Sequence, residues 1–334
     1  MKITRISRKY IILIIIYLLF ITGFLYYITL KTKEDYNNIN ENKIKMFNFW
    51  NMGEEEKNKI ISIFNDFLSQ ETLNTYNEVH IYSVFGNLNF EKNPENLYIQ
   101  YSGESYNNEP SKFDINLIAD EHYDKNNKSA TMKTILFPHG YFNILFTDMN
   151  MNYLLERRIL QKPKTRFCLF CVGNGGNWVR NDFFEKLSKY KTVDSCGSFM
   201  NNMPDNERCP SETIKYLEYI SQYKFMICFE NKGHRNYFTE KLFNAYFGET
   251  IPVYWGCTNV NDYINTDSIL YLKNDHQEQD IENLINEIIY LDNNDEEYHK
   301  KYNQQLFSGD VLPDEFNKEA IKLKLNNLAL TGIQ

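Results

Sequence analysis

Four side chains around one predicted helix start could bind a charged nucleotide. Asn231, Tyr237, Glu240 and Lys241 bring an amide, a phenol, a carboxylate and an ammonium close together in the chain. The start of a helix also presents free backbone N–H groups, which favour phosphate. The residue types and their spacing therefore predict a nucleotide-diphosphate pocket.

The elements that must position these side chains form a strand, a helix and a second strand. The apolar run 224–229 predicts a buried strand, and apolar residues at helical spacing over 239–247 predict a helix with Thr239 or Asn236 as its cap. A further strand is expected over 251–255. In such a unit, ligands bind beyond the carboxyl ends of the parallel strands.

An earlier strand and helix point toward the same edge. The strand 165–172 leads through the glycine loop 173–176 into a helix over 179–190, with Arg180 near its start. The loop lacks the G-x-G-x-x-G spacing, so its glycines alone are weak evidence for phosphate binding. Its value is the position of Arg180, which we expect to face the same crevice as Lys241.

The first part of the chain predicts another α/β unit. A helix is expected over 54–68, and the last helix is expected over 314–330. The strand 115–119 is expected to be followed by an irregular stretch that runs through 137–140. Strands are expected over 44–50, 79–85, 97–101 and 115–119. We therefore expect an α/β protein of GT-B type, with two Rossmann-like domains that face each other across a cleft.

Three spaced blocks of this sequence resemble one enzyme family. Residues 229–231 (FEN), 237–241 (YFTEK) and 250–256 (TIPVYWG) are similar, in the same order, to the donor-binding block of the α-1,3-fucosyltransferases, glycosyltransferase family 10. The resemblance is tight over 165–275, moderate over 97–124 and faint over 44–86. An amphipathic helix between two core strands, with solvated charges, is the plain alternative.

The resemblance implies a role for each residue of the pocket. Arg180 and Lys241 match positions that clamp the pyrophosphate of GDP-fucose, while Glu240 would accept hydrogen bonds from ribose or guanine. Asn231 and Tyr237 would line the nucleotide and the fucose. Glu230 is expected to orient the loop rather than contact the donor.

The proposed base lies in the first half of the chain. Glu104 stands in the sequence Tyr101-Ser-Gly-Glu-Ser105, at the end of a predicted strand. This stretch is similar to the short glycine-acidic motif that supplies the family's catalytic carboxylate, so Glu104 is predicted as the general base. Taken alone, a glutamate after a glycine is more often a surface loop residue.

No metal and no cofactor are expected. Two cations can neutralise a leaving diphosphate, and the sequence contains no D-x-D motif, so a divalent metal would at most stimulate the reaction. The acidic runs 120–121 and 295–297 are expected on solvated faces. His234 and Arg235 could contact a phosphate or be solvated, and the second interpretation is favoured.

The activity that the resemblance implies is inverting transfer of L-fucose from GDP-fucose to a GlcNAc hydroxyl, in α-1,3 linkage, on a glycoprotein or glycolipid glycan. Two alternatives stay open: a GT-B transferase that uses another nucleotide sugar, and a catalytically silent carbohydrate-binding membrane protein. The net charge of −8, without a basic stripe, argues against a nucleic-acid partner.

The N-terminal sequence predicts a membrane anchor. Residues 10–30 carry no charge and are long enough to span a bilayer. Basic residues precede them, which predicts a cytosolic tail over 1–9 and a single-pass type II protein in the Golgi or another secretory membrane, with its catalytic part in the lumen. A cleaved signal peptide is the alternative.

The remaining boundaries follow from composition. A polar stem is expected over 31–43, an acceptor-side α/β domain over 44–160, a GDP-fucose-binding α/β domain over 161–310, and a helix and tail over 311–334. The six cysteines all lie in the C-terminal half, where they allow fifteen pairings. The C-x-x-C pair at 168 and 171 is expected to be buried thiols or part of a structural bridge rather than a zinc site.

Overall fold

The computed structural model describes residues 22, 43–120 and 133–331 of the chain. The predicted anchor over 10–30 and most of the predicted stem therefore lie outside the described residues, apart from Thr22 and Lys43. Among the described residues, the helices are all too short or too polar to cross a membrane.

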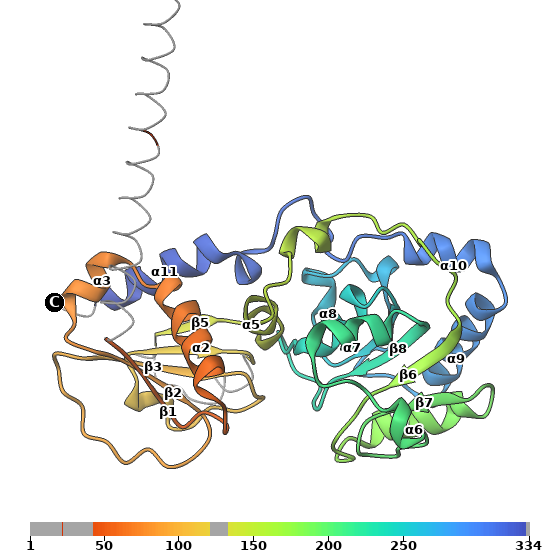
Figure 1. The fold of residues 1–334 in the computed structure, drawn as a ribbon, viewed down its shortest axis with the longest axis horizontal. Coiled ribbons are helices and arrows are strands. Elements are labelled where there is room, and N and C mark those ends of the chain that lie inside the picture. The colour runs from red at the N-terminus through yellow and green to blue at the C-terminus, as the bar shows by residue number, and fades with distance from the viewer. Residues whose placement is uncertain (1–21, 23–42, 121–132, 332–334) are drawn as a thin grey trace, which may run out of the picture.

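The chain forms two lobes, each built on a five-stranded parallel sheet (Figure 1). The strands of the first sheet pair in the order in which they occur in the chain: β1 (Ile44–Phe47), β2 (Val79–Ser83), β3 (Leu97–Ser102), β4 (Ile115–Ile118) and β5 (Thr134–Leu136). The second sheet has the order β10-β9-β8-β6-β7, with bounds β6 (Arg166–Phe170), β7 (Val193–Ser195), β8 (Tyr223–Phe229), β9 (Ile251–Trp255) and β10 (Leu270–Tyr271).

The two sheets differ in one respect that matters for a ligand. In the second sheet the strand order reverses between β6 and β8, which pair directly. Such a reversal opens a crevice at the carboxyl ends of the two strands, where α/β proteins bind ligands. The first sheet has no such reversal, so only the second lobe is doubly wound and the expectation of two Rossmann-like domains holds for the second sheet alone.

Helices cover the sheets and connect the lobes. Their bounds are α2 (Glu54–Phe67), α3 (Gln70–Thr75), α5 (His139–Phe146), α6 (Trp178–Ser188), α7 (Thr213–Ile220), α8 (Glu240–Phe247), α9 (Glu278–Asp292), α10 (Asp295–Tyr302) and α11 (Lys318–Leu330). Most predicted elements are present with slightly shorter ends. Eight of the helices and strands named above were not predicted from the sequence: α3, β5, α5, β7, α7, β10, α9 and α10. Of these, β5 and the start of α5 fall in the stretch through Gly140 that was predicted to be irregular.

Aromatic loops cover part of the first sheet. The ring of Phe90 stacks on Tyr82 of β2 and on Tyr98 of β3, with ring centroids 4.6 and 5.2 Å apart. Phe113, from the loop after β3, packs against the same group of rings. These stacked rings remove apolar surface from water.

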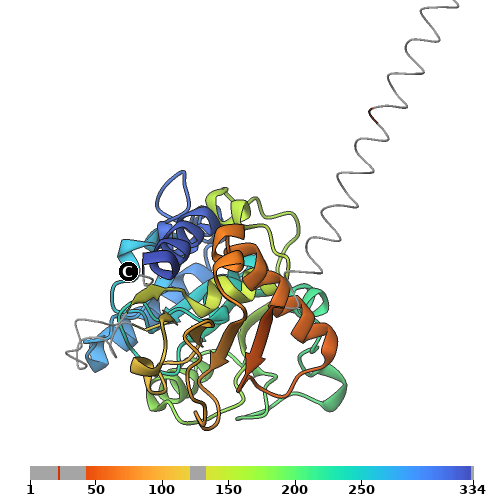
Figure 2. The same ribbon diagram turned by 90° about the vertical axis from the view of Figure 1, so that its left-hand side faces the viewer.

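One hydrophobic core runs through both lobes. It includes Tyr101 and Tyr141 from the first lobe and Phe238 and Phe243 from the second. The last helix, α11, returns from the second lobe and packs beside α2 and α3 of the first (Figure 2). The lobes are therefore joined by packed side chains as well as by the chain itself.

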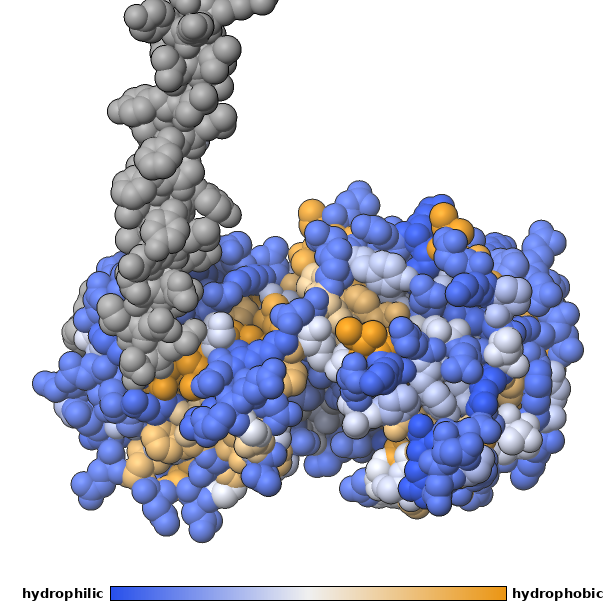
Figure 3. Space-filling view, in the orientation of Figure 1, coloured by the Kyte–Doolittle hydropathy of each residue, from blue (hydrophilic) through white to orange (hydrophobic). Residues whose placement is uncertain are grey.

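The face in Figure 3 is largely hydrophilic, and its apolar areas are small and scattered.

Candidate functional site

The start of helix α8 is fixed by a buried carboxylate. Glu230 is fully buried, and its two carboxylate oxygens accept hydrogen bonds from the backbone N–H and the hydroxyl of Thr239, at 2.8 and 2.5 Å. Thr239 occupies the predicted cap position, but its hydroxyl donates to Glu230 instead of capping the helix. Burial raises the pKa of Glu230. Glu230 therefore holds the loop in place rather than facing a ligand.

Glu240 and Lys241 form an ionised pair in the first turn of α8. The Lys241 Nζ lies 3.3 Å from the Glu240 Oε1, 2.9 Å from the Thr239 hydroxyl and 3.5 Å from Glu230. Burial opposes ionisation of Glu240, but Lys241 and His139 outweigh it and lower its pKa to about 2. Burial likewise acts against the charge of Lys241, but Glu240 and Glu230 raise its pKa above the ordinary value. Both side chains are charged at neutral pH.

Arg180 reaches the same crevice from helix α6. Its guanidinium donates to the carbonyl oxygens of Asn174 and Phe229 and to the Asn231 Oδ1, the last at 3.2 Å. The residue is only 2% exposed, and burial lowers the pKa of the guanidinium. Arg180 and Lys241 are close enough for Arg180 to oppose the charge on Lys241. In this conformation Arg180 organises the loops around the crevice and contributes its positive field.

Asn231 and Tyr237 are placed differently from each other. Asn231 is exposed just beyond β8 and is held by Arg180, so its side chain borders the crevice. Tyr237 is 1% exposed and belongs to the core, and burial raises the pKa of its hydroxyl. Of the two, Asn231 is the one that a ligand can reach in this conformation.

Glu104 lies at the carboxyl end of β3 in the first lobe. It lines a cavity of about 270 Å³ together with other residues from the ends of the first sheet: Trp50, Ser83, Phe85, Tyr101, Gly103 and His139. The negative charge of Glu104 acts on Tyr101 and His139, and so does the negative charge of Glu240. The predicted base Glu104 and the predicted donor-binding residue Glu240 therefore both lie close to Tyr101 and His139.

His139 is a site residue that the sequence analysis missed. It starts helix α5, and its ring lies between Tyr101 of the first lobe, 2.8 Å from the hydroxyl, and Glu240 of the second, 3.9 Å from the carboxylate. One signal could have found it. Glu104, Asp120 and His139 each follow the carboxyl end of a strand of the first sheet, and in a parallel sheet these ends share one edge.

The expectation that Asp120 is solvated is wrong. Asp120 follows β4 and is 3% exposed, and its carboxylate bonds the ring of His234, from the loop after β8. Arg235 pairs instead with Asp262 at 3.4 Å, on the exposed surface. The interpretation that His234 is solvated is therefore wrong, because His234 bonds Asp120 and so joins the second lobe to the first.

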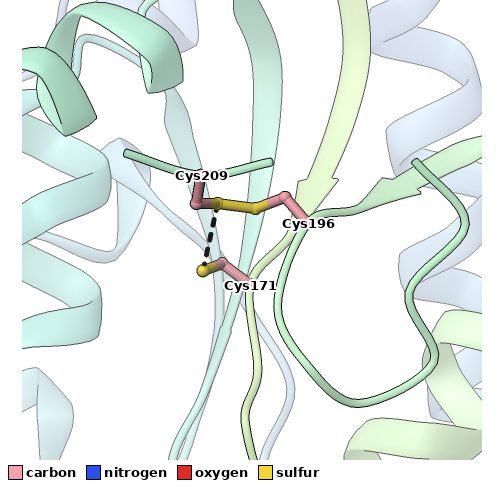
Figure 4. Close-up of side chains that lie close together, drawn as sticks. All are labelled: Cys171, Cys196 and Cys209. Carbon is pink, nitrogen blue, oxygen red and sulfur yellow. Dashed lines mark hydrogen bonds between the residues drawn. A yellow bond between two sulfur atoms is a disulfide. The ribbon is translucent and has the colours of Figure 1, made fainter. Parts of the chain in front are cut away.

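Three cysteines gather behind the glycine loop. Cys196 and Cys209 form a disulfide, and the Cys171 sulfur lies 3.3 Å from the Cys209 sulfur (Figure 4). Cys168 is a separate buried thiol, so Cys168 and Cys171 are not bonded to each other. The loop closed by the disulfide packs on the glycine loop, since Phe199 touches Gly175 and the Ser198 hydroxyl donates to the Gly173 carbonyl at 3.1 Å.

Comparisons with known proteins relate part of this chain to one enzyme family. Residues 161–308 match the family described as glycosyltransferase family 10 (fucosyltransferase), C-terminal part. The chain is 35% identical over 128 residues to the alpha-(1,3)-fucosyltransferase FucT of Helicobacter pylori, which covers 38% of this chain and 25% of that protein. It is 32% identical over 125 residues to the GDP-fucose protein O-fucosyltransferase 3 of Xenopus tropicalis, covering 36% and 26%.

Solved structures extend the likeness to both lobes. A crystal structure of an alpha1,3-fucosyltransferase superposes with a TM-score of 0.62, covering 86% of this chain and 90% of that one at 20% identity. A crystal structure of an alpha1,3-fucosyltransferase with GDP-fucose superposes with a TM-score of 0.58, covering 86% of this chain and 89% of that one. The matches to curated relatives span only about a quarter of their length. The family match contains Arg180, Asn231, Glu240 and Lys241. Residues 161–308 therefore match the C-terminal domain of glycosyltransferase family 10, the fucosyltransferase family.

Proposed function

We propose that this protein is an inverting α-1,3-fucosyltransferase, which transfers L-fucose from GDP-fucose to a GlcNAc hydroxyl of a glycoprotein or glycolipid glycan. The observation that carries the proposal is the placement of Glu104 in the first lobe and of Glu240 and Lys241 in the second, with His139 between them. A carboxylate for the acceptor and a cation for the leaving group are the two things that the reaction needs.

The second lobe would bind the donor. The Lys241 side chain is 20% exposed at the start of α8, where the helix N-terminus also favours phosphate. The guanidinium of Arg180 adds a second positive charge close to Lys241. The Arg180 Nε has no hydrogen-bond partner among the described residues. Glu240 and Asn231 are the polar groups that ribose, guanine or fucose would meet, and Tyr237 packs behind them.

The chemistry needs one carboxylate and no covalent intermediate. Glu104 takes the proton of the acceptor hydroxyl while the oxygen of that hydroxyl attacks the anomeric carbon of fucose. The bond between that carbon and the phosphate oxygen breaks, and GDP leaves with the electron pair. Attack from the side opposite the leaving group converts the β-linked donor into an α-linked product. Lys241 and Arg180 stabilise the negative charge that GDP gains.

The cavity beside Glu104 would hold the acceptor. It combines the carboxylate with two partly exposed aromatic rings, Trp50 at 39% and Phe85 at 37%. A sugar presents apolar C–H faces to aromatic rings and hydroxyls to polar groups, so a pyranose ring suits such a mixed cavity.

We propose that no divalent metal is required, since two protein cations face the leaving group. This predicts activity that persists in EDTA. A metal that raised the rate several-fold without being essential would still agree with this role of Lys241 and Arg180.

A second acceptor class has its own support. The relatives at 31–33% identity include proteins named GDP-fucose protein O-fucosyltransferase 3. Such a name describes the same donor with a protein hydroxyl as the acceptor. The acceptor of this chain could thus be a glycan or a polypeptide, and the two are separated by experiment.

The test is release of GDP by the full chain in detergent and EDTA, with GDP-fucose as donor. Three acceptor arms are needed: N-acetyllactosamine, a GlcNAc-terminated N-glycan, and a folded protein panel without glycans. Release that depends on a glycan supports the glycan acceptor, and release that depends on a polypeptide supports the second class. Parallel arms with GDP-mannose and UDP-sugars test for another donor. Binding of GDP-fucose without turnover in any arm would indicate a silent carbohydrate-binding protein.

We also propose that residues 10–30 anchor the protein in a Golgi or other secretory membrane, with the catalytic lobes in the lumen. The support is their uncharged composition and the basic residues before them. Protease protection of the full chain in sealed microsomes tests this. Lobes that are digested without detergent, or a chain released from the membrane by carbonate, would contradict it.

A further inference from the structure

His139 connects two parts of the site that belong to different lobes. Its Nδ1 lies 2.8 Å from the Tyr101 hydroxyl, and its Nε2 lies 3.9 Å from the Glu240 Oε2. The other oxygen of Glu240, Oε1, faces Lys241 at 3.3 Å. The carboxylate of Glu240 is thus held from two sides, by a cation of its own lobe and by a ring of the opposite lobe.

Close packing leaves His139 little freedom. A Cβ atom on Gly103 would lie 2.4 Å from the His139 Nδ1, so the ring rests directly on the backbone before Glu104. A Cβ atom on Gly140 would lie 2.3 Å from the Phe243 ring, and the Gly140 N–H donates to the Phe238 carbonyl at 3.1 Å. Helix α5 is therefore docked against α8 at the residue next to His139.

The neighbours of the ring select its tautomer. The hydroxyl of Tyr101 is buried, and burial together with Glu104 and Glu240 raises its pKa, so the hydroxyl keeps its proton. Nδ1 of His139 is its only hydrogen-bond partner among the described residues. If Tyr101 donates to Nδ1, a neutral imidazole carries its own proton on Nε2, which faces Glu240.

The ring is neutral at physiological pH. Burial lowers the pKa of His139; Glu240 and Glu104 oppose this change, and Lys241 adds to it. Together with Tyr101, these are the titratable groups that face the ring from β3, from the loop after it and from α8. An N–H dipole that faces an ionised carboxylate at 3.9 Å is electrostatically favourable without a charge on the ring.

We propose that His139 is a positioning residue for donor binding: in the Nε2–H tautomer set by Tyr101, it orients the carboxylate of Glu240 toward the hydroxyl groups of the nucleotide sugar. The inference rests on the proposed function and deepens it. It makes donor affinity in the second lobe depend on a side chain of the first lobe.

Two substitutions separate this role from a purely structural one. In His139→Gln the side-chain amide nitrogen can occupy the place of Nε2 and still place an N–H group near the Glu240 carboxylate. In His139→Asn the amide oxygen can occupy the place of Nδ1 and accept from Tyr101, but nothing reaches Glu240. Titration calorimetry with GDP and GDP-fucose on the full chain in detergent compares the two variants.

We expect His139→Asn to weaken binding roughly three- to ten-fold, the range for loss of one polar contact, and His139→Gln to stay near the wild-type affinity. In a Glu240→Gln background, His139→Asn should cause no further loss, because the group that it positions is gone. The opposite order, with Gln as damaging as Asn or worse, would overturn the proposal. So would equal affinities for all three proteins.

A readout without ligand keeps the inference separate from the proposed function. Nitrogen-15 NMR of labelled histidine should show His139 as the Nε2–H tautomer at neutral pH, and Tyr101→Phe should mix the tautomers. An Nδ1–H signal in the wild type would overturn the inference. If His139→Asn does not fold, the Tyr101→Phe protein provides the same test by NMR and calorimetry. A wild-type protein with the Nε2–H tautomer that binds no GDP would instead overturn the proposed function.

Discussion

The carboxylate of Asp120 at the end of β4 bonds the imidazole of His234 in the loop after β8, and this contact joins the two lobes beside the crevice. Asp120 is 3% exposed, whereas the side chain of His234 is 21% exposed. A buried carboxylate needs such a partner, because an isolated buried charge is strongly disfavoured. The loop that carries Asn231 is thereby fastened to the first lobe.

Asp120→Ala should lower the free energy of unfolding by about 2 kcal/mol, since it removes the buried carboxylate that bonds the His234 ring. Urea unfolding of the full chain in detergent measures the change. Asp262→Ala is the matched control, because Asp262 pairs with Arg235 of the same loop on the exposed surface, where a pair is worth about 0–1 kcal/mol. Equal losses in the two variants would contradict the interlobe role of Asp120.

Glu104→Gln should reduce fucose transfer at least about 100-fold, the usual range for loss of a general base, and leave GDP binding unchanged. The substitution keeps the size of the side chain and removes only its basicity. Glu109→Gln is the control, since Glu109 lies in the same loop but is exposed and pairs with Lys112. A Glu104→Gln protein with nearly normal transfer would show that another group takes the proton.

Lys241→Ala should weaken GDP binding roughly 10-fold or more, because it removes the partly exposed cation at the start of α8. Calorimetry with GDP gives the affinity, and circular dichroism checks the fold, since Glu230 loses a charged partner in this variant. Lys232→Ala, at an exposed position of the preceding loop, should bind GDP like the wild type. An unchanged affinity in Lys241→Ala would exclude Lys241 from pyrophosphate binding.

Glu240 should make the stability of the protein depend on acid pH. Its pKa is about 2 in the folded protein and near the ordinary value of 4.5 when unfolded, so its ionised form stabilises the fold above pH about 4.5. This contribution, at most about 3 kcal/mol, should be lost as the pH falls from about 4.5 toward 2.

Unfolding free energies measured between pH 5 and 2 test this, and Glu240→Gln should flatten the curve. Glu278→Gln serves as the comparison, because the side chain of Glu278 is 62% exposed in its pair with Lys186. A wild-type curve no steeper than that of Glu240→Gln would disprove the contribution.

Cys196→Ser should leave Cys209 to pair with Cys171, because the two sulfur atoms already lie 3.3 Å apart. Burial raises the pKa of the Cys171 thiol, so the new bond should form slowly, over hours, in oxidised glutathione. Peptide mapping by mass spectrometry identifies the pair, and Cys171→Ser in the same background should keep Cys209 unpaired with any cysteine of the chain. A Cys209 that stays a free thiol in Cys196→Ser alone would contradict the prediction.

The sequence by itself determined three of the five strands of the second sheet, β6, β8 and β9, and the helices α6 and α8. The apolar runs 224–229 and 251–255 predict β8 and β9, because buried strands need apolar side chains on both faces. The spacing of Leu242, Phe243 and Tyr246 predicts α8, because these residues share one helical face. Adjacent parallel strands then bring Arg180 and Lys241 to one edge.

Only the tertiary structure decided which residues of the first lobe join that edge. Helix α5 begins at Pro138-His139-Gly140, where proline and glycine indicate a turn, and the need for Gly140 comes from Phe243, far along the chain. The burial of Asp120 depends on His234, and the choice of one disulfide among fifteen depends on where two loops meet. Local sequence patterns indicate which segments form strands and helices, but contacts between distant segments depend on how the whole chain packs.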